Sequence, residues 1–197
     1  MEIKNLPEKY QPIWENSLPL LKSGRAGDVK HSAEVVKLIL DNKNIKKEFL
    51  DILIPVAIMH DIGHSMILPE HLEYVTGGKK IMNGKLVHML VGAKIADNIL
   101  KKIKYDKEKS VEIIEIISMH DADQLKGINL EEIYDTEIKK IFHDVDSLDR
   151  FTQERVDSMS SMFPGKNLIE LLRGSLKNFF YDNFREIAKK QLDDLKD

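Results

Sequence analysis

The stretch IPVAIMHDIGH, residues 54–64, decides both the fold and the chemistry that we expect of this chain. A run of apolar side chains leads directly into His60 and Asp61, two groups that are costly to bury unless something pairs with them. His31 upstream and Asp146 downstream also lie in or beside apolar helical patterns. Each of these four side chains can donate a lone pair to a divalent metal, so a bound ion would account for all of them at once.

Two further histidines, His88 and His120, fall between these residues on other predicted helices, which leaves room for a second ion. The chain contains no cysteine, so a transition-metal site can have only nitrogen and oxygen ligands. Imidazole with carboxylate suits Fe, Mn, Zn, Co or Ni and disfavours Ca and Mg. The sequence therefore predicts one or two divalent transition metal ions.

The composition is that of an ordinary globular protein, with 197 residues of which 42% are hydrophobic and 32% are charged. The formal net charge of −3 argues against a dedicated surface for nucleic acid or anionic lipid. The N-terminal sequence MEIKNLPEKYQP lacks the apolar core of a signal peptide. We expect no apolar run of the chain to be long enough to cross a bilayer. We expect a cytoplasmic protein whose partners include neither a nucleic-acid polymer nor a membrane.

The hydrophobic periodicity is helical almost throughout, which predicts an all-α fold. SAEVVKLIL, residues 32–40, has the one-sided pattern of a surface helix, with Asp28 as a plausible N-cap. Residues 47–62 are apolar on nearly all sides and predict a central buried helix that stops at Gly63 and is either bent at Pro55 or divided there into two helices. The remaining segments are helical patterns over residues 86–103, 107–120, 135–151 and 168–195, and a long loop over residues 65–85.

Taken in order, GRAGDVKHSAEVV, IPVAIMHDIGH, VHMLVGAKIADNIL, IIEIISMHDADQ and IFHDVDSLDR resemble the HD-domain superfamily of metal-dependent phosphohydrolases. The resemblance implies an HD-domain-like helical bundle with an additional C-terminal helical segment. We divide the chain into an N-terminal helical extension (1–24), an HD metal-binding domain (25–151) and C-terminal helices (152–197). These last helices pack on the same domain or on a partner subunit, which leaves a homodimer open.

The resemblance also implies which residues bind metal. The implied ligands are His31, His60, Asp61, His88, His120 and Asp146, with Asp61 bridging two ions. Asp144 is the alternative to Asp146, because HDVDSLDR can be aligned with the family pattern in either register. The chain has His64 after HDIG where the cyclic-dinucleotide phosphodiesterase branch favours lysine, which argues against that specificity.

Catalysis is assigned to Asp61, His64 and Arg25 on the same resemblance. His64 lies one helical turn beyond His60 and has the ring chemistry of a general acid or base. Candidates for binding substrate phosphate are Arg25, Lys79, Lys80 and Arg150, with Lys85 as a further candidate. The plainer alternatives are a solvated loop for the lysines, a helix-end cap for His64 and an ion pair for Arg150, with His71 and His143 on the surface or behind the ligands.

The function implied is hydrolysis of a phosphoester or phosphoanhydride bond in a small phosphorylated metabolite, with a nucleotide favoured, by metal-activated water. Two alternatives belong to other classes. One is a di-iron oxygenase of the HD fold, which the same ligands would permit. The other is a non-catalytic HD domain that senses a nucleotide, although the intact ligand set argues against it.

Overall fold

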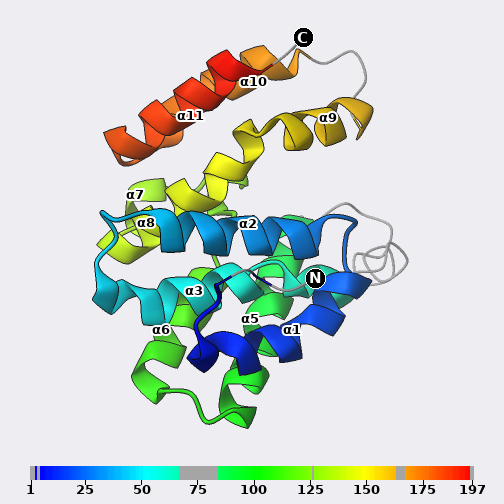
Figure 1. Ribbon diagram of the computed structural model, residues 1–197, viewed down its shortest axis with the longest axis vertical. Coiled ribbons are helices and arrows are strands. Elements are labelled where there is room, and N and C mark those ends of the chain that lie inside the picture. The colour runs from blue at the N-terminus through cyan, green and yellow to red at the C-terminus, as the bar shows by residue number, and fades with distance from the viewer. Residues whose placement is uncertain (1–2, 4, 67–83, 126, 163–166, 196–197) are drawn as a thin grey trace. The chain divides into compact units, whose positions relative to one another are not determined.

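A computed structural model describes residues 3, 5–66, 84–125, 127–162 and 167–195 of the chain (Figure 1). Helices make up all the regular secondary structure in these described residues, and no strand occurs among them, so the all-α prediction is confirmed. The chain divides into two compact units, Met1–Asp135 and Thr136–Asp197. The boundaries predicted at residues 24/25 and 151/152 stay predictions.

The first unit is built around α3 (Leu50–Met59), the predicted central helix. Every residue from position 52 to position 59 is buried, because the helix is apolar on all sides and must be covered on all of them. Its neighbours are α1 (Gln11–Ser23), α2 (Asp28–Asp41) and α6 (Lys107–Ile117). Figure 1 shows α2 and α3 lying side by side.

Pro55 lies inside α3 and neither ends it nor divides it. Proline has no backbone N–H, so the carbonyl of Asp51, four residues earlier, loses its helical donor. The hydroxyl of Tyr105 donates to that carbonyl instead, at 2.8 Å. A tertiary hydrogen bond thus replaces the missing helical one, and the helix continues to Met59.

The prediction that the central helix stops at Gly63 is wrong, because Gly63 is a point of close packing beyond the end of the helix. The helix ends at Met59, and Gly63 lies in the following 3-10 turn η3 (Ile62–Met66), which packs on α5 (Gly84–Lys102). A Cβ atom at Gly63 would lie only 2.0 Å from the carbonyl oxygen of His88 and 2.7 Å from the backbone nitrogen of Gly92. Glycine is therefore needed for η3 to approach α5 this closely.

The N-terminal residues belong to the first unit. Tyr10 in η1 (Glu8–Tyr10) and Trp14 in α1 are both buried and form part of its core. The unit is completed by the short elements η2 (Lys47–Phe49), η4 (Ala122–Gln124) and α7 (Leu130–Ile133). Most of the predicted loop over residues 65–85 lies outside the described residues, whereas Ser65 and Met66 belong to η3.

The second unit contains α8 (Glu137–Leu148), η5 (Asp149–Phe151), α9 (Gln153–Met162), α10 (Leu168–Ser175), η6 (Leu176–Asn178) and α11 (Asp182–Asp194). The continuous amphipathic pattern predicted over residues 168–195 is interrupted at residues 179–181. At this break, the buried Asp144 carboxylate accepts hydrogen bonds from the backbone N–H groups of Phe180 (3.0 Å) and Tyr181 (2.8 Å). These bonds hold the two residues that immediately precede α11.

The segment Lys47–Met66 is long and apolar enough to cross a membrane by length and composition alone, contrary to the expectation from the sequence. It consists of η2, α3 and η3, and 67% of its most apolar window is buried inside the protein. This degree of burial is typical of a core helix.

Candidate metal centre

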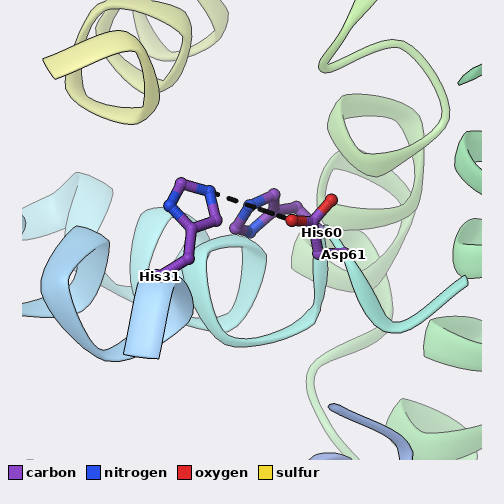
Figure 2. Close-up of side chains that lie close together, drawn as sticks. All are labelled: His31, His60 and Asp61. Carbon is purple, nitrogen blue, oxygen red and sulfur yellow. Dashed lines mark ion pairs between the residues drawn. The ribbon is translucent and has the colours of Figure 1, made fainter. Parts of the chain in front are cut away.

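Asp61 lies at the centre of a buried group of histidines, just beyond the end of α3. Its Oδ2 atom is 3.6 Å from Nε2 of His60 and 3.9 Å from Nε2 of His31, which comes from α2. Figure 2 shows the two imidazole rings and the carboxylate directed toward one another. One donor atom from each of these three residues lies within 4.8 Å of the others. The structure thus brings together three of the predicted ligands.

The other carboxylate oxygen of Asp61 faces a second set of imidazoles. Its Oδ1 atom is 3.7 Å from Nε2 of His88 on α5 and 3.7 Å from Nε2 of His120, which follows α6. These two histidines and Asp61 form a second group whose donor atoms all lie within 4.8 Å of one another. His64 Nε2 is 3.3 Å from the same Oδ1 atom, and its ring stacks on that of His88 with 4.1 Å between centroids. Asp61 is therefore shared by two clusters, one at each oxygen.

The positions of His60 and His120 just after helix ends explain how their rings are oriented. The last carbonyls of a helix have no helical donor. The Nδ1 atom of His60 bonds to the carbonyl of Ala57 (3.1 Å), and that of His120 bonds to the carbonyl of Ile117 (2.8 Å). A carbonyl can only accept, so each Nδ1 carries a proton, and Nε2, which faces Asp61, is the ring atom that could bind a metal. This arrangement is typical of metal-binding histidines.

The charges in the cluster also suit a cation. Burial raises the pKa of Asp61, but the surrounding His60, His120, His64 and Arg25 outweigh burial and hold the pKa well below its ordinary value. Burial lowers the pKa of His88 to about 3, helped by the neighbouring imidazoles. At neutral pH the cluster therefore combines an ionised carboxylate with a neutral His88.

The donor set fits a divalent transition metal. Neutral imidazole nitrogens and carboxylate oxygens, without thiolates, are the ligands of Fe, Mn, Zn, Co and Ni in proteins. The Nε2 atoms of His88 and His120 lie 3.1 Å apart in the buried interior, where two nitrogen lone pairs repel unless a proton or a cation lies between them. His31, His60 and Asp61 could hold one ion, and Asp61, His88 and His120 a second.

Arg25, predicted as a catalytic and phosphate-binding residue, also reaches the cluster. Its guanidinium donates from Nη2 to Oδ2 of Asp61 at 2.6 Å and from Nε to Oδ1 of Asp28 at 3.1 Å. The side chain is 46% exposed, so it lies at the rim of the cluster.

The other predicted site residues are not placed in this cluster by the structure. Asp146 and Arg150 belong to the second unit, on α8 and η5, and their roles stay predictions. Lys79 and Lys80 lie outside the described residues, as does His71, and Lys85 is described only as part of α5. Both oxygens of Asp144 accept backbone hydrogen bonds, which favours Asp146 over Asp144 as the metal ligand.

Three side chains behave differently from what the sequence suggested. Asp28 is not the N-cap of α2, a position held by Gly27 with φ of 100°, but its first residue and the partner of Arg25. His143 is buried and bonds through Nδ1 to Asp144 at 2.9 Å, which excludes the surface position, one of the two alternatives expected for it. Tyr134 was not singled out at all, although its buried hydroxyl donates to the carbonyl of His120 at 3.0 Å. Only the Arg25–Asp28 spacing of three residues could have suggested one of these contacts.

A comparison with protein families gives one match, to the HD domain, over residues 28–151. No curated protein and no solved structure matches the chain. The matched residues contain every predicted metal ligand, and HD domains bind divalent metals through His and Asp side chains of the kind clustered around Asp61. The chain therefore belongs to the HD-domain family.

Proposed function

We propose that the protein is a metal-dependent phosphohydrolase that cleaves a phosphoester or phosphoanhydride bond in a small phosphorylated metabolite, with nucleotides as the first class to test. The observation that carries the proposal is the division of the site between the two oxygens of Asp61, each facing a pair of imidazole nitrogens. Such a carboxylate is suited to bridging two ions. Membership of the HD family supports the same class of reaction.

Divalent ions in sites of this kind lower the pKa of a bound water and polarise a phosphoryl oxygen. His31 and His60 would hold one ion with Oδ2 of Asp61, and Asp146 is the further ligand that we propose for it. His88 and His120 would hold the other with Oδ1. Burial of His60, His88 and His120 keeps competing water away from these ligand atoms.

Two residues at the rim are suited to act on the substrate. His64 is partly buried, its imidazole belongs to the side-chain class that most often serves as a general acid or base, and its Nε2 lies 3.3 Å from Oδ1 of Asp61. Arg25 is 46% exposed and presents planar donors that match two oxygens of a phosphoryl group. A net charge of −3 favours a small substrate over a polymeric nucleic acid. We also propose that the reaction takes place in the cytoplasm.

The test combines metal analysis of the purified protein with a hydrolysis screen that measures both liberated phosphate and nucleotide products separated by chromatography. The substrates are nucleoside mono-, di- and triphosphates, cyclic dinucleotides and dinucleoside polyphosphates, each assayed with and without prior treatment with a chelator. We expect hydrolysis of at least one class, its loss after chelation, and its return with one of Mn, Fe, Co, Ni or Zn. If the metal-loaded protein hydrolysed none of these substrates, the proposal would be contradicted.

The same preparation separates the two alternatives. Anaerobic titration with ferrous iron followed by exposure to oxygen would give a mixed-valent spectroscopic signal if the site were a di-iron oxygenase centre. Nucleotide binding without turnover by the metal-loaded protein would instead indicate a sensor domain.

A further inference from the structure

Arg25 lies between two buried carboxylates that differ in what else surrounds them. Asp61 belongs to both histidine clusters, whereas Asp28 bonds to Arg25 twice, through the guanidinium Nε (3.1 Å) and the backbone N–H (2.8 Å). Asp28 is only 3% exposed and faces no imidazole in a metal-binding group among the described residues. Burying a carboxylate is costly, so its contacts with Arg25 must offset that cost.

The backbone is shaped to allow this pairing. A Cβ atom at Gly24 would lie 2.7 Å from Oδ2 of Asp28, so a larger residue would push the carboxylate away from the N–H of Arg25. Gly27, with φ of 100°, turns the chain into α2 immediately before Asp28. Asp28 thus holds both the backbone and the side chain of Arg25, while the end of the guanidinium reaches Asp61.

The oxygen of Asp61 that Arg25 contacts is the one that faces His31 and His60. Nη2 of Arg25 is 2.6 Å from Oδ2, closer than the imidazole nitrogens at 3.6 and 3.9 Å. A guanidinium and a divalent ion at the same oxygen repel each other, and the repulsion is strong where burial excludes water. The other oxygen, Oδ1, faces the imidazoles of His64, His88 and His120 at 3.3, 3.7 and 3.7 Å.

We propose that Arg25 competes with the metal for Oδ2 of Asp61, and that Asp28 is a positioning residue that keeps the displaced guanidinium at the rim of the site, where it binds an oxygen of the anionic substrate. The inference rests on the proposed function. It assigns opposite effects to one residue, since Arg25 weakens metal binding at one cluster and strengthens binding of the phosphoryl group. Asp28 has a role only in the second effect.

Calorimetric titration of the chelator-treated protein with Mn²⁺ tests the competition. Arg25→Gln removes the charge and is expected to tighten the site formed by His31, His60 and Asp61 about tenfold, whereas Arg25→Lys, which keeps the charge, should change it far less. Arg25 is nearly half exposed, so neither variant opens the core. Mn²⁺ affinity that is unchanged or weaker in Arg25→Gln would overturn the proposal, because an arginine that merely orients Asp61 would support metal binding.

Binding of orthophosphate to the Mn²⁺-loaded protein tests the positioning role. Asp28→Asn should weaken phosphate binding about tenfold while the number of bound Mn²⁺ ions stays that of the wild type. Thermal unfolding of the variant shows whether it folds. If it does not, binding of orthophosphate by the Arg25 variants decides whether the guanidinium binds the anion. Unchanged phosphate affinity in a folded Asp28→Asn protein overturns the role of Asp28. A wild-type protein that binds no Mn²⁺ overturns the proposed function as well, whereas wild-type binding without tightening in Arg25→Gln overturns the competition alone.

Discussion

Two aspartates flank the central helix α3, and they have opposite surroundings. Asp51 is its second residue, and its carboxylate accepts hydrogen bonds from Lys9 Nζ (2.5 Å), Tyr10 Oη (2.7 Å) and Lys109 Nζ (2.6 Å). Asp61 lies just beyond the other end of the helix, among imidazoles and Arg25. Both carboxylates have a lowered pKa, but for different reasons.

The difference lies in what the partner groups can still do. Ammonium and hydroxyl groups donate to Asp51, and the bonds from Lys109 and Lys9 are the main cause of its lowered pKa. An ammonium group has no lone pair to offer, so this cluster cannot hold a cation. The imidazoles of His60 and His120 bond to carbonyls through Nδ1 and face Asp61 with Nε2, an atom that can give a lone pair to a cation. The partners of a carboxylate therefore separate a structural acid from a candidate metal ligand.

Replacing Asp61 with Asn should have the largest effect in the molecule. The amide keeps the shape of the side chain but loses the charge shared by both clusters. We expect loss of stoichiometric metal binding, measured by metal analysis after dialysis, and a fall of at least about 10³-fold in phosphate release.

Asp51→Asn is the matched control, because it makes the same chemical change at the other end of the same helix. It should leave the metal content unchanged and lower the free energy of unfolding by about 1–2 kcal/mol in urea titration, since charge-assisted bonds at a partly exposed site are lost. If both variants lost metal to the same extent, the distinction between the two aspartates would be wrong.

His88→Gln should have the next largest effect, because it removes one ligand from the Oδ1 cluster only. We expect the metal stoichiometry to fall from two ions to one and the affinity of the second site to drop about 10- to 100-fold. Titration with Mn²⁺ measures both quantities. Asp51→Asn again serves as the control with two ions, and a His88→Gln protein that still binds two ions with wild-type affinity would remove His88 from the site.

The residues of both clusters were predicted together from the resemblance to the HD-domain family, whose motifs are local features of the chain. The sequence did not predict the contact of Arg25 with Asp61, residues 36 positions apart, which depends on how α2 lies on α3. It also misplaced the end of α3, because Gly63 looks like a helix stop but is needed for packing on His88 and Gly92. The break in the last predicted helix likewise depends on hydrogen bonds from residues 180 and 181 to Asp144, which no local pattern reveals.

The pH dependence of stability should separate the two carboxylate clusters. The pKa of His88 is about 3 in the folded protein and about 6.5 in an unfolded chain, so between these values only the unfolded chain takes up a proton at this residue. Stability of the chelator-treated protein should therefore fall as the pH falls through this window, with His88 contributing about 1–2 kcal/mol of the loss between about pH 7 and pH 5. Urea titrations at several pH values measure it.

His88→Gln should flatten this decline, whereas Asp51→Asn should not change it. The pKa of Asp51 is lowered on folding, so its contribution to stability is present above the unfolded pKa of about 3.9 and is lost only as the pH falls further, toward the folded pKa. An unaltered slope between about pH 7 and pH 5 in His88→Gln would mean that His88 is not held neutral by its surroundings.

Tyr10→Phe should have the smallest effect, and it tests how completely Asp51 is satisfied. The change removes the one hydroxyl donor of this carboxylate and leaves both ammonium groups in place. Because the ring itself is 1% exposed and keeps its packing, we expect a loss of about 0.5–1.5 kcal/mol in urea titration and no change in metal content. A loss as large as that of Asp51→Asn would show that the hydroxyl, rather than the lysines, holds the start of α3 to the N-terminal residues. A change in metal binding would show that the two ends of α3 are coupled, which their separate sets of contacts give no reason to expect.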